Sequence, residues 1–256
     1  MSIIDSYNES RPLISPESFY QQGNIADICI VTFSHKVLED VLKKYDCKKE
    51  VCAGTANGKI QVYSLIEGES KILFYMSPIG AACAGCIIDE VSYMTGAKKF
   101  IVFGSCGSLD NDLTSGKFII PTESYRDEGF SYHYQKASDF IEITNSQRLA
   151  QFFEKLSIPY VCGKSWTTDA IYRETVVNVA KRKEDGCISV EMESAGLQAL
   201  CTFKKLELYT FFFASDLVDG EVWENVNLGT SEERKKQINC FEIALQLTEL
   251  MIIENS

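Results

Sequence analysis

Three acidic residues in apolar surroundings are the side chains of this sequence best suited to chemistry. Glu191 and Glu193 flank Met192, and Asp216 follows Ser215 at the end of an apolar segment. A buried carboxylate without a partner is costly, so these acids need a ligand that donates hydrogen bonds. The neighbouring hydroxyl groups of a ribose are such donors. The pattern therefore predicts a sugar-binding pocket.

Asp216 is a candidate proton donor because of the segment that precedes it. Residues 208–214 are too apolar to face water and are typical of a buried strand. Open α/β sheets bind ligands at the carboxyl ends of their strands, where an acid is placed to protonate a leaving group. The alternative is that Asp216 caps the turn after the strand.

Two other segments are candidates for ligand contacts. The apolar run 100–103 leads into Gly104 and Ser105, where small residues let backbone amides approach an anion closely. The alternative there is an ordinary tight turn. Residues 127–134 crowd aromatic rings into a loop, and Tyr134 is a candidate for stacking on a flat heterocycle. The alternative is a loop held to the core by aromatic packing.

The composition excludes several classes of protein. Acidic residues outnumber basic ones 36 to 25 among 256 residues, which gives a net charge of -11, so we expect no nucleic-acid partner. The apolar runs are too short for a membrane span. The ten cysteines favour reduced thiols and a cytoplasmic location. Cys83 and Cys86 have the spacing of a metal pair, but no second pair completes a site, so helix packing is favoured.

Strand-like and helix-like segments alternate along the chain. Short apolar runs predict strands at 28–33, 60–65, 72–76, 100–103, 118–121 and 208–214. Helical spacing predicts helices at 35–45, 81–95, 146–156, 170–183 and 191–203, and a capping box at Thr230 and Glu233 begins a terminal helix. This alternation predicts one α/β domain, residues 25–256, with a sheet covered on both faces. An arm, residues 1–24, precedes it and is of the kind that often reaches a neighbouring subunit.

The motifs occur in an order that resembles the nucleoside phosphorylase family, over roughly residues 25–250. This family includes purine nucleoside phosphorylases, uridine phosphorylases and methylthioadenosine nucleosidases. The segments that carry the resemblance are Gly104-Ser-Cys-Gly107, Arg126-Asp-Glu-Gly-Phe-Ser-Tyr-His-Tyr134, Trp166-Thr-Thr-Asp-Ala170, Val190-Glu-Met-Glu-Ser-Ala-Gly196 and Ser215-Asp216. The resemblance implies a single α/β domain around a twisted, partly barrel-like mixed sheet flanked by helices on both sides.

The resemblance also implies roles for individual residues. Glu193 would hold the ribose 2′ and 3′ hydroxyls, with Met192 against the sugar and Glu191 in the same pocket. Asp216 would protonate the base, and Ser215 would lie beside it. Tyr134 would stack on the base. Gly104 and Ser105 would bind the phosphate.

The expected phosphate arginines are where this sequence departs from the family. Lys36, Val102 and Asn57 stand where three arginines are expected. Lysine holds phosphate only as a point charge, and each lost charge-assisted hydrogen bond removes ~1.5 to 3 kcal/mol. Arg234 stands about where the family carries an arginine that closes over the site. Arg126 and Arg173 are other candidates to compensate.

The sequence favours a purine nucleoside phosphorylase that uses inorganic phosphate as co-substrate, with no cofactor and no metal. Because uridine phosphorylases lack an acid that matches Asp216, a purine is favoured. One alternative is a hydrolytic nucleosidase, for which Glu39 is the only obvious residue to activate water. Another is a nucleoside-binding relative without turnover. The resemblance further implies a homo-oligomer, as dimers or as hexamers built from three dimers.

Overall fold

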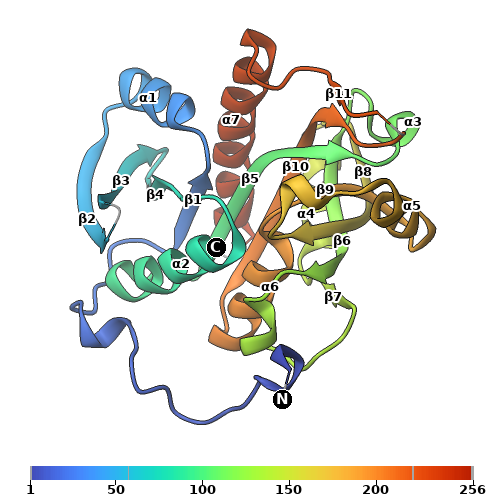
Figure 1. Cartoon of the computed structure of the whole chain (residues 1–256). Helices are drawn as coiled ribbons and strands as arrows, with labels where there is room; N and C mark the ends of the chain where they lie inside the picture. The colour runs from blue at the N-terminus through green and yellow to red at the C-terminus, as the bar shows by residue number, and fades with distance from the viewer. Residues whose placement is uncertain (1, 57, 221, 255–256) are drawn as a thin grey trace.

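A twisted mixed sheet with helices on both faces forms the body of the protein (Figure 1). The computed structural model describes residues 2–56, 58–220 and 222–254. In these ranges the strands are β1 (Ile28–Thr32), β2 (Lys48–Thr55), β3 (Gly58–Glu67), β4 (Ser70–Met76), β5 (Lys99–Ser108), β6 (Phe118–Asp127), β7 (Phe140–Glu142), β8 (Tyr160–Thr168), β9 (Cys187–Glu191), β10 (Glu207–Leu217) and β11 (Glu224–Asn225). They lie in the order β11-β10-β6-β8-β9-β5-β1-β4-β3-β2, and β7 pairs with β6.

Five of these strands close into a ring. β10 pairs with both β5 and β6, while β6, β8, β9 and β5 pair in succession. A bulge between Ala214 and Asp216 shifts the register of β10 against β5. Bulges bend a strand and often lie beside active sites. The prediction of a partly barrel-like α/β fold is confirmed.

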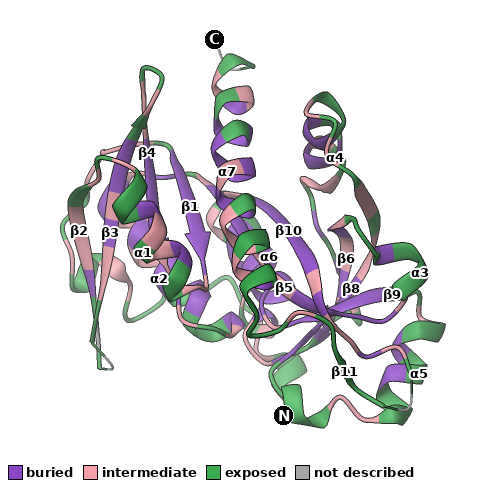
Figure 2. Cartoon of the chain, turned by 90° about the horizontal axis from the view of Figure 1, so that it is seen from above, coloured by how far each residue is buried: buried purple, intermediate pink, exposed green. Residues whose placement is uncertain are grey.

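Two layers of helices bury the sheet. The α-helices of the described residues are α1 (His35–Lys44), α2 (Ala81–Thr95), α3 (Asn111–Thr114), α4 (Ser146–Lys155), α5 (Val176–Glu184), α6 (Ser194–Lys204) and α7 (Ser231–Ile253). One core cluster joins the sheet to α1, α4 and α7, and a second joins it to α2 and α6. Figure 2 shows β1 and β10 as largely buried strands between these helices. Every residue of β1 is buried, which explains its unbroken apolar run.

α2 and α6 approach each other closely at Gly196. A Cβ atom at this position would lie 2.6 Å from the Cβ of Ala81 and 3.1 Å from the ring of Phe130. The N–H of Ala81 donates to the carbonyl of Met192 over 3.0 Å, so the first turn of α2 is tied to the segment before α6. This contact fixes the backbone on which Glu193 lies.

Some elements differ from the sequence prediction. β8 and β9 were not predicted, because polar residues interrupt their apolar pattern. Two of these polar residues form a hydrogen bond with each other: the hydroxyl of Ser189 donates to that of Ser165 over 3.2 Å. The helix predicted from residue 191 begins at Ser194, because Glu191 still belongs to β9. The helix predicted at 170–183 divides into η4 (Ile171–Arg173) and α5.

The N-terminal segment contacts the loop after β6 of the same chain. It contains two 3-10 helices, η1 (Ile3–Asp5) and η2 (Pro16–Ser18), and the side chain of Ile3 lies 3.3 Å from the Cβ position of Gly129. The helices in the described ranges include none with the length and apolar character needed to cross a membrane. All ten cysteines fall within these ranges, and each is a free thiol.

Candidate active site

The candidate acids meet where β5, β9 and β10 come together. Asp216 of β10 is in register with Gly107 of β5, which is in turn opposite Val190 of β9. A Cβ atom on Gly107 would lie 2.8 Å from Val218, 2.9 Å from Val190 and 3.5 Å from Oδ2 of Asp216. A larger residue would therefore press on β9, which ends at Glu191, and crowd Asp216. The glycine lets the two groups of acids share one site.

Asp216 accepts hydrogen bonds at both carboxylate oxygens. The hydroxyl of Ser215 donates to Oδ1 over 2.9 Å, and the indole N–H of Trp223 donates to Oδ2 over 2.8 Å. Trp223 reaches this position because β11 folds back on β10, with Asn225 opposite Asp216. No local pattern predicts this role of Trp223, since the hairpin that positions it is formed by a two-residue strand.

Glu174 is a second residue near Asp216 that the sequence analysis did not single out. Glu174 follows η4 and precedes Thr175, the N-cap of α5. Burial and the negative charge of Asp216 raise the pKa of Glu174 to about 7. Glu174 is therefore an acid that changes protonation near neutral pH beside the predicted proton donor.

Glu191 organises the backbone instead of facing a ligand. Its Oε2 accepts the N–H groups of Glu193 and Ser194, each over 2.8 Å. Its Oε1 accepts the hydroxyls of Thr167, in a short hydrogen bond, and of Ser165, over 3.4 Å. The predicted direct contact between Glu191 and ribose is not supported, because these four protein donors occupy its carboxylate. Glu191 instead fixes the start of α6.

Glu193 keeps more of its bonding capacity. Its Oε1 accepts the N–H of Gly80 over 2.7 Å, and a carboxylate has further lone pairs for ligand hydroxyls. Gly80 has a φ of 98°, a conformation that favours glycine. Burial, followed by the charge of Glu191, raises the pKa of Glu193 to about 8. Met192 lies between the two acids, as the sequence places it.

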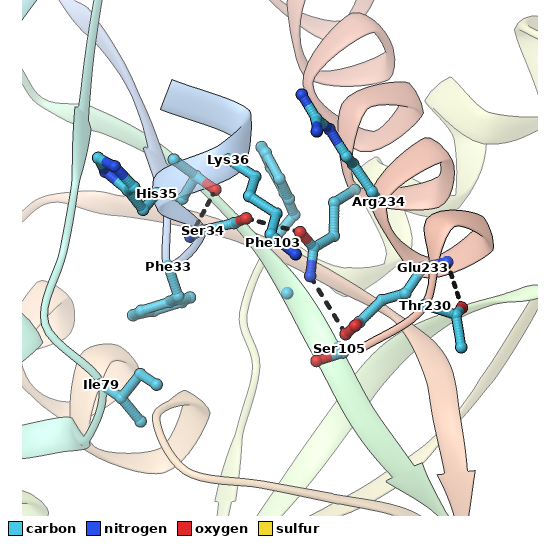
Figure 3. A pocket seen from close by; sticks show the side chains of 13 residues that line it. Phe33, Ser34, His35, Lys36, Ile79, Phe103, Ser105, Thr230, Glu233 and Arg234 are labelled. Carbon is cyan, nitrogen blue, oxygen red and sulfur yellow. Dashed lines mark hydrogen bonds between the residues drawn. The ribbon is translucent and has the colours of Figure 1, made fainter. Parts of the chain in front are cut away.

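A cavity of about 390 Å³ lies at the start of α1, and Glu191, Glu193 and Asp216 are not among the residues that line it. Its walls bring together the predicted phosphate residues Lys36, Gly104 and Ser105 with Arg234 (Figure 3). Ile79 also lines it, and the next residue, Gly80, is bonded to Glu193. The cavity thus joins the start of α1, the middle of β5 and the start of α7, next to the predicted ribose site.

A chain of hydrogen bonds crosses one wall of the cavity. The hydroxyl of Ser34 and Oε1 of Gln237 lie 2.6 Å apart, and Nε2 of Gln237 donates to Glu233 over 3.2 Å. Glu233 also accepts the N–H of Gly229 over 2.6 Å, while its own N–H donates to Thr230 over 3.2 Å. Glu233 therefore serves the N-terminal cap of α7, as the capping-box pattern predicts.

The arginines proposed to compensate lie in different environments. Arg126 is buried and donates to Ser131, Ser138 and the carbonyls of Lys136 and Gln135, so it organises the loop after β6. The structure does not support a phosphate role for Arg126, because its donors are used by this loop. Arg173 is exposed on η4, away from the residues that line the cavity. Arg234 lines the cavity, but Asp40 holds its guanidinium.

Tyr134, the residue predicted to stack on the base, lies in an aromatic cluster. Tyr134 packs against Phe130 and Phe203, with ring centroids 4.7 and 5.6 Å apart. The ring of Phe130 in turn lies 3.1 Å from the Cβ position of Gly196, so Tyr134 belongs to an aromatic cluster packed on α6. The pKa of Tyr134 is raised to about 12 by burial and by Cys86 and Asp89 of α2, which agrees with a packing role.

Of the positions that replace family arginines, Lys36 lines the cavity and Val102 does not. Val102 is buried in the core cluster beneath α2, and Asn57 lies outside the described residues. Glu39, the candidate for activating water, is 3.3 Å from His35 and is not among the residues that line the cavity.

The chain belongs to the phosphorylase superfamily, whose pattern matches residues 27–248. It is similar to a DeoD-type purine nucleoside phosphorylase of Thermoanaerobacter sp., with 28% identity over 67% of this chain and 73% of that protein.

A second relative matches over more of the chain. The DeoD-type purine nucleoside phosphorylase of Caldanaerobacter subterraneus is 26% identical over 89% of this chain and 97% of the relative. Among solved structures, a futalosine hydrolase mutant of Helicobacter pylori superposes with a TM-score of 0.69, at 15% identity, over 88% of this chain and 100% of that one. This last likeness shows the fold.

Proposed function

We propose that this protein cleaves the N-glycosidic bond of a purine nucleoside, with inorganic phosphate as the attacking nucleophile. The products would be the free base and ribose 1-phosphate. The observation that carries the proposal is the arrangement of Asp216, Glu193 and the cavity around one site. Asp216 lies on β10 and Glu193 follows β9, and these two strands pair with β5. The cavity, which Ile79 lines next to the Gly80 contact of Glu193, supplies Lys36 and Ser105.

The chemistry of glycosidic cleavage assigns each part a task. As the bond breaks, positive charge develops on the ribose and electrons arrive on the base. Glu193 would accept hydrogen bonds from the ribose hydroxyls and hold the sugar in place as positive charge develops on it. Asp216 would give a proton to the base, which suits a purine because its N7 accepts that proton. Phosphate would enter from the cavity and attack C1′ as the bond opens.

Hydrolysis is the second candidate, and the cavity itself provides the reason. Its arginine is engaged by Asp40, and Val102 is buried where a second arginine would be expected. Glu233 adds a carboxylate to the wall, which opposes an anion. Water would then attack in place of phosphate and the sugar product would be free ribose.

The setting of the reaction is part of the proposal. We infer a homo-oligomer that takes a nucleoside and phosphate as small-molecule substrates and needs no further cofactor. Ten free thiols suit the reducing cytoplasm, where nucleoside salvage would occur.

A substrate panel tests the reaction class. Inosine, adenosine, guanosine, uridine and methylthioadenosine are incubated separately with the protein, and release of the base is followed by chromatography. We expect release from purine nucleosides and little from uridine. Measurable binding without release from any of these nucleosides would contradict the enzyme proposal and favour a binding protein.

A further inference from the structure

The cavity arginine is held by an acid on a different helix. Arg234 of α7 donates to Asp40 of α1 through Nε over 2.9 Å and through one terminal nitrogen over 2.5 and 2.7 Å. Such a planar, two-pronged contact uses the guanidinium edge that would otherwise grip a phosphate. In Figure 3 the guanidinium of Arg234 points away from Ser105. The strongest anion-binding group on the cavity wall is therefore already occupied.

The side chains left for an anion are weaker. Lys36 is exposed and acts as a point charge, while Gln237 is neutral and Glu233 is a carboxylate. Asp40 stabilises the charged form of Arg234 and raises its pKa, and Arg234 lowers the pKa of Asp40. An incoming phosphate would have to compete with Asp40 for the same donors.

The pair is not needed to fasten α1 to α7. Ser34 and Gln237 already join the start of α1 to α7. At the other end of α1, Lys44 and Tyr45 both donate to Glu242, over 2.7 and 2.9 Å. Removal of Asp40 would thus leave hydrogen bonds at both ends of this contact.

We propose that Asp40 is a positioning residue that sets the phosphate affinity of the cavity by holding Arg234 away from it. This inference rests on the proposed function, because it assigns the cavity to the phosphate. Binding of phosphate draws Arg234 from Asp40 into the cavity, and the side chain returns to Asp40 when the anion leaves. Asp40 thus weakens phosphate binding without touching the phosphate.

Calorimetric titration with inorganic phosphate at low ionic strength tests this role. The full chain is compared with Asp40→Ala, Asp40→Ala/Arg234→Gln and Glu39→Ala. Glu39→Ala is the matched control. It removes one negative charge from the adjacent position of α1, and the side chain of Glu39 pairs with His35 instead of Arg234. We expect Asp40→Ala to bind phosphate roughly fivefold or more tighter, since it frees a bidentate donor. Glu39→Ala should stay within about twofold, as expected of a screened surface charge.

The double variant identifies the group responsible. We expect it to lose the gain of Asp40→Ala, because the freed arginine is then absent. Equal affinity of Asp40→Ala and Glu39→Ala, or a gain that survives in the double variant, would overturn the inference. Asp40→Asn serves as a second variant if circular dichroism shows that Asp40→Ala does not fold. Phosphate-independent release of free ribose by the unaltered chain would instead overturn the proposed function, without deciding the binding comparison.

Discussion

The two glutamates on either side of Met192 do different work. Glu191 directs its carboxylate to the backbone N–H groups at the start of α6 and to two hydroxyls. Glu193, whose backbone N–H is held by Glu191, accepts one hydrogen bond at its own side chain, from the N–H of Gly80. One acid therefore positions the other, which explains how a carboxylate for ribose is held at a buried site.

Asp216 carries the base half of the proposal, and its amide variant tests it. We expect Asp216→Asn to lower purine release at least tenfold, a loss of ~1.4 kcal/mol or more, because an amide cannot give up the proton. Initial rates of base release measure the effect. Asp219→Asn is the matched control, since Asp219 is three residues away but pairs with Lys183. Equal loss in both variants would remove the special role of Asp216.

The raised pKa of Glu193 predicts a pH dependence of stability. Its pKa rises from 4.5 to about 8 on folding, so between these values the folded chain holds a proton that the unfolded chain has released. The free energy of unfolding should therefore fall as pH rises from about 5 to 8, by at most ~1.4 kcal/mol per pH unit from this one group.

Urea unfolding at four pH values isolates this contribution. Glu193→Gln cannot ionise, so its stability should fall less steeply over the same range. Some slope should remain, because burial also raises the pKa of Glu191 and Glu174. Identical slopes for the variant and the unaltered chain would show that Glu193 is not protonated in the folded state.

Residue identity predicted the acids better than the aromatic contacts. Glu193 follows β9 and Asp216 lies near the end of β10, and a sequence pattern reveals such positions at strand ends. Tyr134 packs on Phe130 and Phe203, and its type and position could not foretell this contact, since an aromatic loop residue packs equally well on a helix as on a ligand. Trp223 and Asp40 could not be found, because their partners depend on how a hairpin and two helices meet.

At the scale of elements, the close approach of α2 and α6 positions the segment that carries Glu193, the residue proposed to bind ribose. Gly196→Ala would place a Cβ 2.6 Å from that of Ala81. We expect a loss of ~1–3 kcal/mol of stability from overpacking, against a gain of at most ~1 kcal/mol from helix propensity. Nucleoside affinity should fall too, because Ala81 is bonded to the carbonyl of Met192.

A glycine in open space provides the comparison. A Cβ at Gly54 would meet nothing within 4 Å, so Gly54→Ala should leave both stability and nucleoside affinity nearly unchanged. Urea unfolding and nucleoside titration measure the two effects. A Gly196→Ala variant as stable as Gly54→Ala would show that α2 and α6 separate at little cost.

The elements most open to prediction from sequence are those with one simple pattern. β1 is buried along its whole length and is apolar from Ile28 to Val31, and α7 begins with the predicted cap at Thr230. β8 and β9 escaped prediction because the ring interior accepts polar side chains such as Ser165 and Ser189 when they bond each other. Closure of the ring depends on pairings between distant segments, which no local pattern contains.

At the scale of the whole molecule, exposed apolar side chains suit the proposed homo-oligomer. Tyr172 of η4 is 96% exposed and Val177 of α5 is 77% exposed, beside Ile171 and Val176. We expect sedimentation velocity to show a dimer or a larger assembly. Tyr172→Glu/Val177→Glu should shift it toward the monomer, because burying two unpaired charges at a contact is costly. A monomeric unaltered chain would contradict the proposal.

The attacking nucleophile is the central claim, and the sugar product tests it most directly. Inosine is incubated with the protein with and without inorganic phosphate, and the sugar is identified by phosphorus and proton NMR. The structure and the proposed roles of Asp216, Glu193 and the cavity predict ribose 1-phosphate that forms only when phosphate is present. Free ribose formed at the same rate with and without phosphate would contradict phosphorolysis and assign the site to hydrolysis.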